Sequence, residues 1–262
     1  MIIISPGTLI WRESTAQQFS NRKFVQTNKP LIIEQNQVPP FQLLVESTFG
    51  AINAFSIIRK ESGASTSILT EMQTAGLSVT NEGSFQNISY PSRVVLTTSL
   101  EVGVYYAEMS DGTNTFYSEE FLMCADVSEF IKVSWCHANN LDLTEEGDLF
   151  LNYGNGYQNR MYFDSQVGKP LYNYEDTVDK RKTKRLPITQ LAYKLRQFEA
   201  ILPEPTIDAA FVIRLHDFVT IEFLGRVWSS DEFFMNQPEW LTQGDLASVI
   251  FQFKTNKVAV SY

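Results

Sequence analysis

The chain is poor in the residues that most often build catalytic and metal sites. Its 262 residues include two histidines, His137 and His216, and two cysteines, Cys124 and Cys136. A zinc site needs paired cysteine or histidine units, and these four residues do not form such pairs. Two cysteines also cannot build a disulfide framework, so we expect free thiols and synthesis in a reducing compartment. The composition therefore predicts neither a bound metal nor a cofactor.

Motifs of known enzyme classes are also lacking. His216 and Asp217 are adjacent and could orient an imidazole, but no G-x-S-x-G or similar nucleophile signature accompanies them. The GNG stretch at residues 154–156 lacks the third glycine of a dinucleotide fingerprint. The acidic stretch at residues 142–148, DLTEEGD, lacks the residue order of a calcium loop. We therefore expect no enzymatic activity, and a capping role for the His216-Asp217 pair.

The chain has no long apolar run and no excess of basic residues. Its apolar run at the N-terminus, residues 2–4, is too short for a membrane span or a secretion signal. Thirty Asp and Glu residues outnumber 21 Lys and Arg residues, which gives a formal charge of −9. Such a balance disfavours nonspecific nucleic-acid binding. We therefore expect a soluble protein, made in the cytoplasm, that contacts neither membrane nor nucleic acid directly.

Aromatic residues are abundant, and they frame the strongest local signal in the chain. Asp-Gly at residues 111–112 separates two runs rich in Val, Tyr and Phe, which predicts a β-hairpin over residues 102–121. A two-residue loop would place Tyr106 opposite Tyr117 and turn Val104 and Tyr106 toward the core. A three-residue loop would shift the register by one and turn the other face inward.

The first half of the chain has the pattern of a β-sandwich. Short strands recur about every ten residues from Pro39 to Cys124, one of them expected at residues 67–72. The GVYYAE stretch at residues 103–108 and the strand that follows the turn resemble the last two strands of immunoglobulin-like and fibronectin type III domains. This resemblance implies an Ig-like antiparallel sandwich over residues 39–125, with Tyr105 or Tyr106 as its typical tyrosine. The inter-sheet disulfide of antibody domains is lacking.

Residues 1–38 are expected to form an extended N-terminal arm. They hold three short apolar pieces separated by polar connections. Such an arm either supplies the first strand of its own domain or covers a neighbouring subunit, and we predict the second arrangement because exposed apolar pieces promote aggregation. Deleting residues 1–28 should then leave a folded monomer that no longer assembles. The apolar residues expected at this interface are Ile3, Leu9, Trp11 and Ile32.

Residues 126–262 are predicted to form a second, mostly antiparallel β domain. Residues 190–202 fit both helical and strand spacing, and we favour a strand because prolines bracket them. Residues 205–215 have the proline and alanine pattern of a short helix. The charge run at residues 175–185, EDTVDKRKTKR, predicts a solvated loop or, alternatively, a docking finger that contacts an acidic neighbour.

The second half also resembles structural proteins of tailed bacteriophages. The stretches that carry this resemblance are TQLAYKLRQFEAILPEPTIDAAFVIRLHDFVTIEF and the closing LASVIFQFKTNKVAVSY, similar to tail and neck proteins of phages that infect Bacteroidetes. The resemblance implies a virion protein that forms a homo-oligomeric ring with copies of itself and contacts other virion proteins. Trp228 and Trp240 are further interface candidates. The alternative is a carbohydrate-binding or adhesin module that displays these tryptophans to host glycans, and a β-sandwich hydrolase ranks third.

Overall fold

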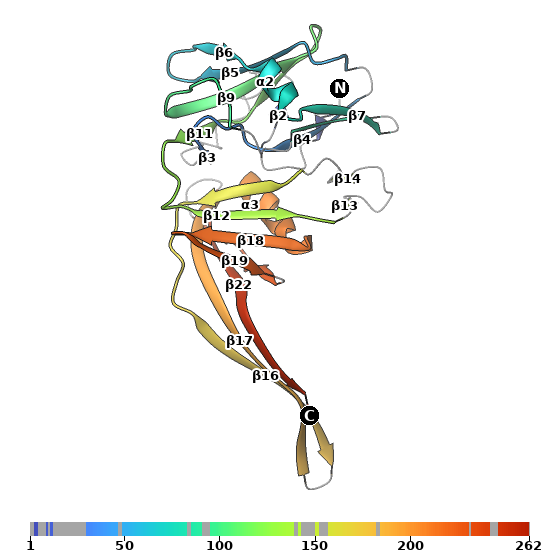
Figure 1. The fold of residues 1–262 in the computed structure, drawn as a ribbon, viewed down its shortest axis with the longest axis vertical. Coiled ribbons are helices and arrows are strands. Elements are labelled where there is room, and N and C mark those ends of the chain that lie inside the picture. Colours follow the sequence, from blue (N-terminus) through green and yellow to red (C-terminus); the bar gives the residue numbers. More distant parts are fainter. Residues whose placement is uncertain are drawn as a thin grey trace.

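The protein is mainly β, with one antiparallel sandwich followed by a second β domain and a short helix, which confirms the predicted fold class. The computed structural model describes residues 3–4, 9, 11–12, 30–46, 49–82, 85–90, 95–138, 141–142, 150–151, 157–181, 184–230, 232–241 and 246–261. Figure 1 shows the sandwich at one end of the long axis, the second domain in the middle and a narrow arm of strands at the other end.

Two sheets face each other in the sandwich. The first has the strand order β1 (Ile3–Ile4), β4 (Phe41–Glu46), β8 (Phe85–Tyr90), β7 (Ser78–Glu82). The second contains β6 (Ser65–Ser67), β5 (Ala54–Arg59), β9 (Gly103–Ser110), β10 (Thr115–Ser118), β11 (Phe121–Cys124), β2 (Trp11–Arg12) and β3 (Leu31–Glu34). β9 pairs with β5 on one side and with β10 and β11 on the other, while β3 runs parallel to β11. These orders match the A-B-E-D and C-F-G sheets of immunoglobulin domains.

The described parts of residues 1–38 belong to this sandwich, which corrects the expectation that these residues form a separate N-terminal arm. β1 pairs with β4, β2 with β10 and β3 with β11. Leu9 and Trp11 are buried, with 1% and 3% of their surface exposed. The Trp11 ring lies 4.9 Å from the Phe41 ring and 5.9 Å from the Phe55 ring, centroid to centroid. Large aromatic side chains fill the space between the sheets, where antibody domains have their disulfide.

The predicted hairpin exists, and of the two inward faces that the sequence left open, the one that carries Tyr105 faces the core. Ser110 pairs with Thr115 and Glu108 with Tyr117, so the connection spans residues 111–114. The Asp111 carboxylate accepts hydrogen bonds from the backbone N–H groups of Thr113 and Asn114, which closes this longer turn. Tyr105, Ala107 and Met109 face the core, since the opposite face carries Glu108, whose charge favours solvent.

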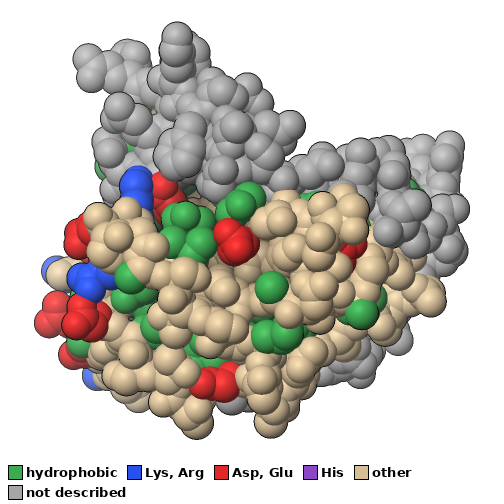
Figure 2. All heavy atoms as spheres, turned by 90° about the horizontal axis from the view of Figure 1, so that it is seen from above, with side chains coloured by type: hydrophobic (Ala, Val, Ile, Leu, Met, Phe, Trp, Pro, Cys, Tyr) green, Lys and Arg blue, Asp and Glu red, His purple; other side chains and the backbone are tan. Residues whose placement is uncertain are grey.

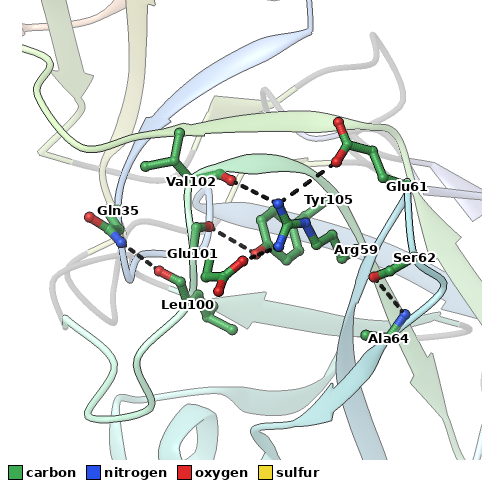
Figure 3. Close-up of polar contacts among 9 residues, drawn as sticks. All are labelled: Gln35, Arg59, Glu61, Ser62, Ala64, Leu100, Glu101, Val102 and Tyr105. Carbon is green, nitrogen blue, oxygen red and sulfur yellow. Dashed lines mark hydrogen bonds and ion pairs between the residues drawn. The ribbon is translucent and has the colours of Figure 1, made fainter.

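Tyr105 makes the contact that is typical of immunoglobulin-like domains. Its ring is buried, and its hydroxyl donates a hydrogen bond to the Glu101 carbonyl oxygen at 2.8 Å, four residues upstream (Figure 3). This is the geometry of the tyrosine corner, in which a tyrosine at the start of a central strand holds the preceding connection. Arg59 lies beside it and pairs with the Glu101 carboxylate, so the same connection is fixed from two sides.

One predicted strand of the sandwich is a helix. α2 (Leu69–Thr74) occupies most of the stretch where we expected a strand at residues 67–72. Met72 of this helix is buried in the sandwich core. Glu71 accepts hydrogen bonds from the backbone N–H groups of Thr97 and Thr98, at 2.8 Å and 3.2 Å, which fastens the helix to a distant loop. These long-range contacts override the strand propensity of the short segment.

The second domain contains three further sheets. Its elements are β12 (Ile131–Cys136), β13 (Leu141–Asp142), β14 (Phe150–Leu151), β15 (Asn159–Phe163), β16 (Leu171–Arg181), β17 (Lys184–Pro203), α3 (Glu204–Phe211), a 3-10 turn at Val212–Leu215, β18 (Phe218–Phe223), β19 (Arg226–Ser230), β20 (Phe233–Met235), β21 (Glu239–Trp240) and β22 (Leu246–Ser261). One sheet has the order β15-β12-β18-β19, another the order β16-β17-β22-β20 with β21 beside β22, and β13 pairs with β14. The strand at residues 190–202 and the helix near residue 205 are confirmed.

The two halves have separate apolar cores that meet at one edge. The first core draws its buried residues from positions 9–123 and the second from positions 131–253. Leu31 packs against both cores. An Arg160 guanidinium N–H donates to the side-chain oxygen of Gln37, which ties β15 to the connection after β3. The sandwich and the second domain are therefore in direct contact, and together they are called the body here. The narrow arm of strands seen in Figure 1 projects from this body.

Candidate functional site

The candidate functional site is the arm formed by β16, β17 and β22. Its base is part of the second core, where Phe198, Ala200 and Leu202 of β17 face Val249 and Phe251 of β22. The Phe198 and Phe251 rings stack at 4.9 Å. Burying such a run of apolar side chains stabilises the base strongly and gives the projecting strands a rigid mount. Figure 1 shows the strands leaving the body from this base.

A β-bulge marks the point where the arm leaves the body. The register between β17 and β22 shifts between Lys194 and Leu195. Lys254 is buried here, pairs with the Glu232 carboxylate and lies 4.2 Å from the centre of the Tyr193 ring. A bulge bends and twists a strand pair, so it can redirect the strands that follow. The ion pair of the buried Lys254 with the partly exposed Glu232, together with the cation–π contact, holds this change of direction in place.

The arm is a single-layer sheet at the start of β16. Four successive residues, from Leu171 to Tyr174, are all exposed, with Tyr172 at 65% and Tyr174 at 74%. Successive residues of a strand point to opposite faces of the sheet, so both faces are open to solvent at this position. A sheet is normally covered on at least one face by a second layer. Two exposed tyrosines on an uncovered sheet therefore mark a surface suited to a partner.

The described part of the charge run, residues 175–181 and 184–185, forms paired strands at the far end of this arm, so the prediction of a loop there is wrong. β16 continues to Arg181 and β17 begins at Lys184, with Lys180 opposite Arg185 and Arg181 opposite Lys184 in the antiparallel register. β22 pairs with β17 as far as Thr189 and Ser261. Among the described residues, β16 and β17 continue beyond the last pair of β17 with β22, and the basic residues lie in this part, where only β16 and β17 pair.

The interface residues expected from the sequence lie in several different environments. Leu9 and Trp11 are in the sandwich core, and Ile3 belongs to β1, opposite Val45. Ile32 is partly buried and lines a cavity of about 260 Å³ between the two halves. The structure does not bring these residues together on one surface.

The two tryptophans predicted at an interface differ in their exposure to solvent. Trp228 is partly buried and packs on the second core, with its ring 5.8 Å from Phe253 and covered by the Arg196 guanidinium at 5.3 Å. Trp240 lies in β21, a short strand at the edge of the arm sheet, and is 54% exposed. Trp240 is therefore open to a ligand or partner, whereas Trp228 is mainly a cover for the core.

A polar cleft lies between the halves, beside the Arg160–Gln37 contact. It has a volume of about 370 Å³, and the residues that line it are Gln37, Lys132, Ser134, Gln158, Arg160, Thr220 and Glu222. Lys132 and Glu222, which are opposite each other on β12 and β18, form an ion pair in its wall at 3.0 Å. Amide, hydroxyl and charged groups around a small concave site suit a polar ligand rather than an apolar one.

His216 caps the 3-10 turn at Val212–Leu215, and His137, which directly follows β12, lies beside it. The His216 ring Nδ1 donates to the Val212 carbonyl oxygen at 2.8 Å, and His137 pairs with the Asp217 carboxylate at 3.2 Å. Burial lowers the pKa of His216. In the described part of the chain, no group of three or more His, Cys, Asp or Glu side chains is placed to hold a metal ion. Both cysteines are free thiols.

Sequence reasoning missed Tyr172 and Tyr174 because alternating Tyr and polar residues are equally typical of a strand that is covered on one face. The charge run that follows them was the available signal, since a dense run of charged residues is rarely part of a packed layer. Among the described residues, no helix is long and apolar enough to cross a membrane. Comparison with protein-family models, curated proteins and solved structures found no match to this chain.

Proposed function

We propose that the chain is a structural subunit that assembles with copies of itself, and that the arm is its main assembly element. The observation that carries this proposal is the single-layer arm with Tyr172 and Tyr174 exposed. A sheet that is uncovered on both faces adds no buried apolar surface, and so no stability, to an isolated monomer. A neighbouring subunit that packs on it would bury the two tyrosine rings and supply the missing layer.

The resemblance of the second half to phage tail and neck proteins supports a specific setting for this assembly, a ring in a virion. In such a ring the same arm of every subunit contacts the next subunit, and other virion proteins contact the remaining surfaces. The chain then acts through packing geometry and not through catalysis. A virion location and cytoplasmic synthesis belong to this proposal.

The test is a variant with a shortened arm. Residues 172–194, which include Tyr172 and Tyr174, are replaced by Asn-Gly, which favours a two-residue turn and joins Leu171 to its cross-strand neighbour Leu195. The base of the arm, with Phe198 and Phe251, is unchanged. We expect this variant to keep the circular dichroism spectrum and thermal transition of the body and to remain monomeric in light-scattering measurements. If the shortened-arm variant associates as strongly as the wild-type protein, the arm has no role in assembly and the proposal is refuted.

A glycan-binding role is the second candidate, favoured by the exposed ring of Trp240. Sugars stack on exposed aromatic rings, and the cleft between the two halves separately offers polar groups that could bind a sugar. Glycan-array binding that is lost in Trp240→Ala and retained in Trp228→Ala would support this role. An array without any signal for the wild-type protein would remove it.

A further inference from the structure

The molecule carries opposite charge at its two ends. Residues 30–129, which form most of the sandwich, contain twelve Asp and Glu against three Lys and Arg. The far end of the arm carries four cations in two successive cross-strand pairs, here called the basic tip: Lys180, Arg181, Lys184 and Arg185. Sandwich and tip lie at opposite ends of the long axis (Figure 1), so the tip cannot reach the sandwich of its own chain.

The pairing within the basic tip indicates an anionic partner. Lys180 is directly opposite Arg185, and Arg181 is directly opposite Lys184. Like charges at directly opposite positions of an antiparallel pair destabilise the pair. A negatively charged surface placed against the tip would offset this repulsion and add attraction.

We propose that the basic tip of one copy docks on the acidic sandwich of a second copy. This inference rests on the proposed function and specifies its contact. The two contacting surfaces differ, so the contact is head-to-tail, and repeating it gives a closed ring or an open filament. We argue for a second copy because its sandwich carries the complementary charge, twelve Asp and Glu against three Lys and Arg in residues 30–129.

Exposed carboxylates are available on the sandwich. Glu61 and Glu101 have 71% and 78% of their side-chain surface exposed, at the end where Arg59 pairs with both. Figure 2 views the molecule from the sandwich end and shows several Asp and Glu side chains on this face, with a group of them at one margin. These groups are far from the arm of the same chain and open to the arm of another.

The first experiment measures self-association by sedimentation velocity at low and high salt. We expect association that weakens on the order of tenfold or more between dilute buffer and high salt, because screening shortens the reach of exposed charges. Neutralising the tip with Lys180→Gln, Arg181→Gln, Lys184→Gln and Arg185→Gln should weaken association by roughly tenfold or more at low salt.

A matched pair of double variants controls for net charge. Arg181→Gln with Lys184→Gln removes two positive charges from the tip, and Lys169→Gln with Arg226→Gln removes two exposed charges from the body. We expect only the first pair to weaken association. Equal effects of both pairs would show that net charge matters and the tip does not, which overturns the inference.

The second experiment identifies the acceptor with a carbodiimide reagent that joins amines directly to carboxylates. Equal amounts of ¹⁴N-labelled and ¹⁵N-labelled protein are mixed, so that mass spectrometry separates crosslinks between copies from those within one copy. We expect crosslinks between copies from Lys180 and Lys184 to carboxylates in residues 30–129.

Crosslinks from the tip to other regions would overturn the inference, as would the absence of self-association. Tip-dependent binding of duplex DNA in a mobility-shift assay, without self-association, would also overturn it and would indicate a nucleic-acid partner. Association that persists in the tip variants but is lost with the shortened arm would overturn this inference and leave the proposed function standing.

Discussion

Lys180 and Arg185 are directly opposite each other on two antiparallel strands, at the far end of an arm that projects from an acidic protein. A stable monomer would benefit from opposite charges at this position. Lys180→Glu should therefore raise the thermal stability of the isolated protein, by about 0.2–1 kcal/mol for the pair, and at the same time weaken association. Thermal melting and sedimentation velocity on the same sample measure both effects. Lys169→Glu is the control, and a variant that is less stable yet associates normally would contradict the prediction.

The two exposed tyrosines of the arm should matter for association and not for folding. Tyr172→Ser with Tyr174→Ser removes rings that are 65% and 74% exposed, so we expect a change of at most about 0.5 kcal/mol in the free energy of unfolding. Association should weaken by roughly tenfold or more, since aromatic side chains are frequent anchors of interfaces.

Tyr105→Phe is the control for the double variant of Tyr172 and Tyr174, because it changes a buried tyrosine of the sandwich. It removes the hydroxyl that bonds to the Glu101 carbonyl oxygen, so it should cost about 0.5–1.5 kcal/mol of stability without changing association. Denaturant unfolding and sedimentation separate the two effects. Loss of folding in the double tyrosine variant would show that β16 is required for the body.

The carboxylate of Asp111 makes the sandwich sensitive to acid. Burial alone would raise its pKa, but hydrogen bonds from the backbone of Asn114, Gly50 and Thr113 outweigh burial and lower the pKa from 3.8 to about 2. A lowered pKa means that the stabilising effect is complete above about pH 4 and is lost as the pH falls through about 2. Asp111→Asn, which keeps one acceptor oxygen, should lose less stability than Asp111→Ala, and neither variant should show this acid dependence in pH-dependent denaturant unfolding.

The residues near the N-terminus should be needed for folding. Trp11 is 3% exposed and contacts Phe41 and Phe55, so Trp11→Ala should cost about 3–5 kcal/mol. The sequence led us to expect that deleting residues 1–28 leaves a folded monomer. The structure predicts instead that this deletion destabilises the sandwich. Thermal melting of both variants checks this. A deletion variant with an unchanged transition would restore the interpretation of an independent arm.

Much of the fold can be read from local pattern. The even spacing of strands and the tyrosine at residue 105 predict the sandwich, because turn chemistry and strand periodicity are local properties. The helix that begins at Glu204 follows from Pro205 in its first turn. The strand at residues 190–202 follows from its prolines and its surroundings.

The remaining features depend on contacts between residues far apart in the chain. The burial of Trp11 follows from the pairing of β2 with β10, more than a hundred residues away in sequence, which no local pattern contains. The helix α2 depends on Glu71 reaching Thr97 and Thr98. The arm was missed for a similar reason, because a charged hairpin that no second layer covers has the composition of a loop.

Hydrogen–deuterium exchange of the arm, with and without assembly, tests the central claim most directly. In the dissociated protein, the amides of β16 that do not bond to β17 should exchange fast, since β16 is an edge strand of its sheet. In the assembled protein, exchange across residues 171–181 should slow by roughly tenfold or more, while β12 in the body serves as the unchanged reference. Slowed exchange confined to other surfaces, with the arm exchanging equally fast in both states, would contradict the account.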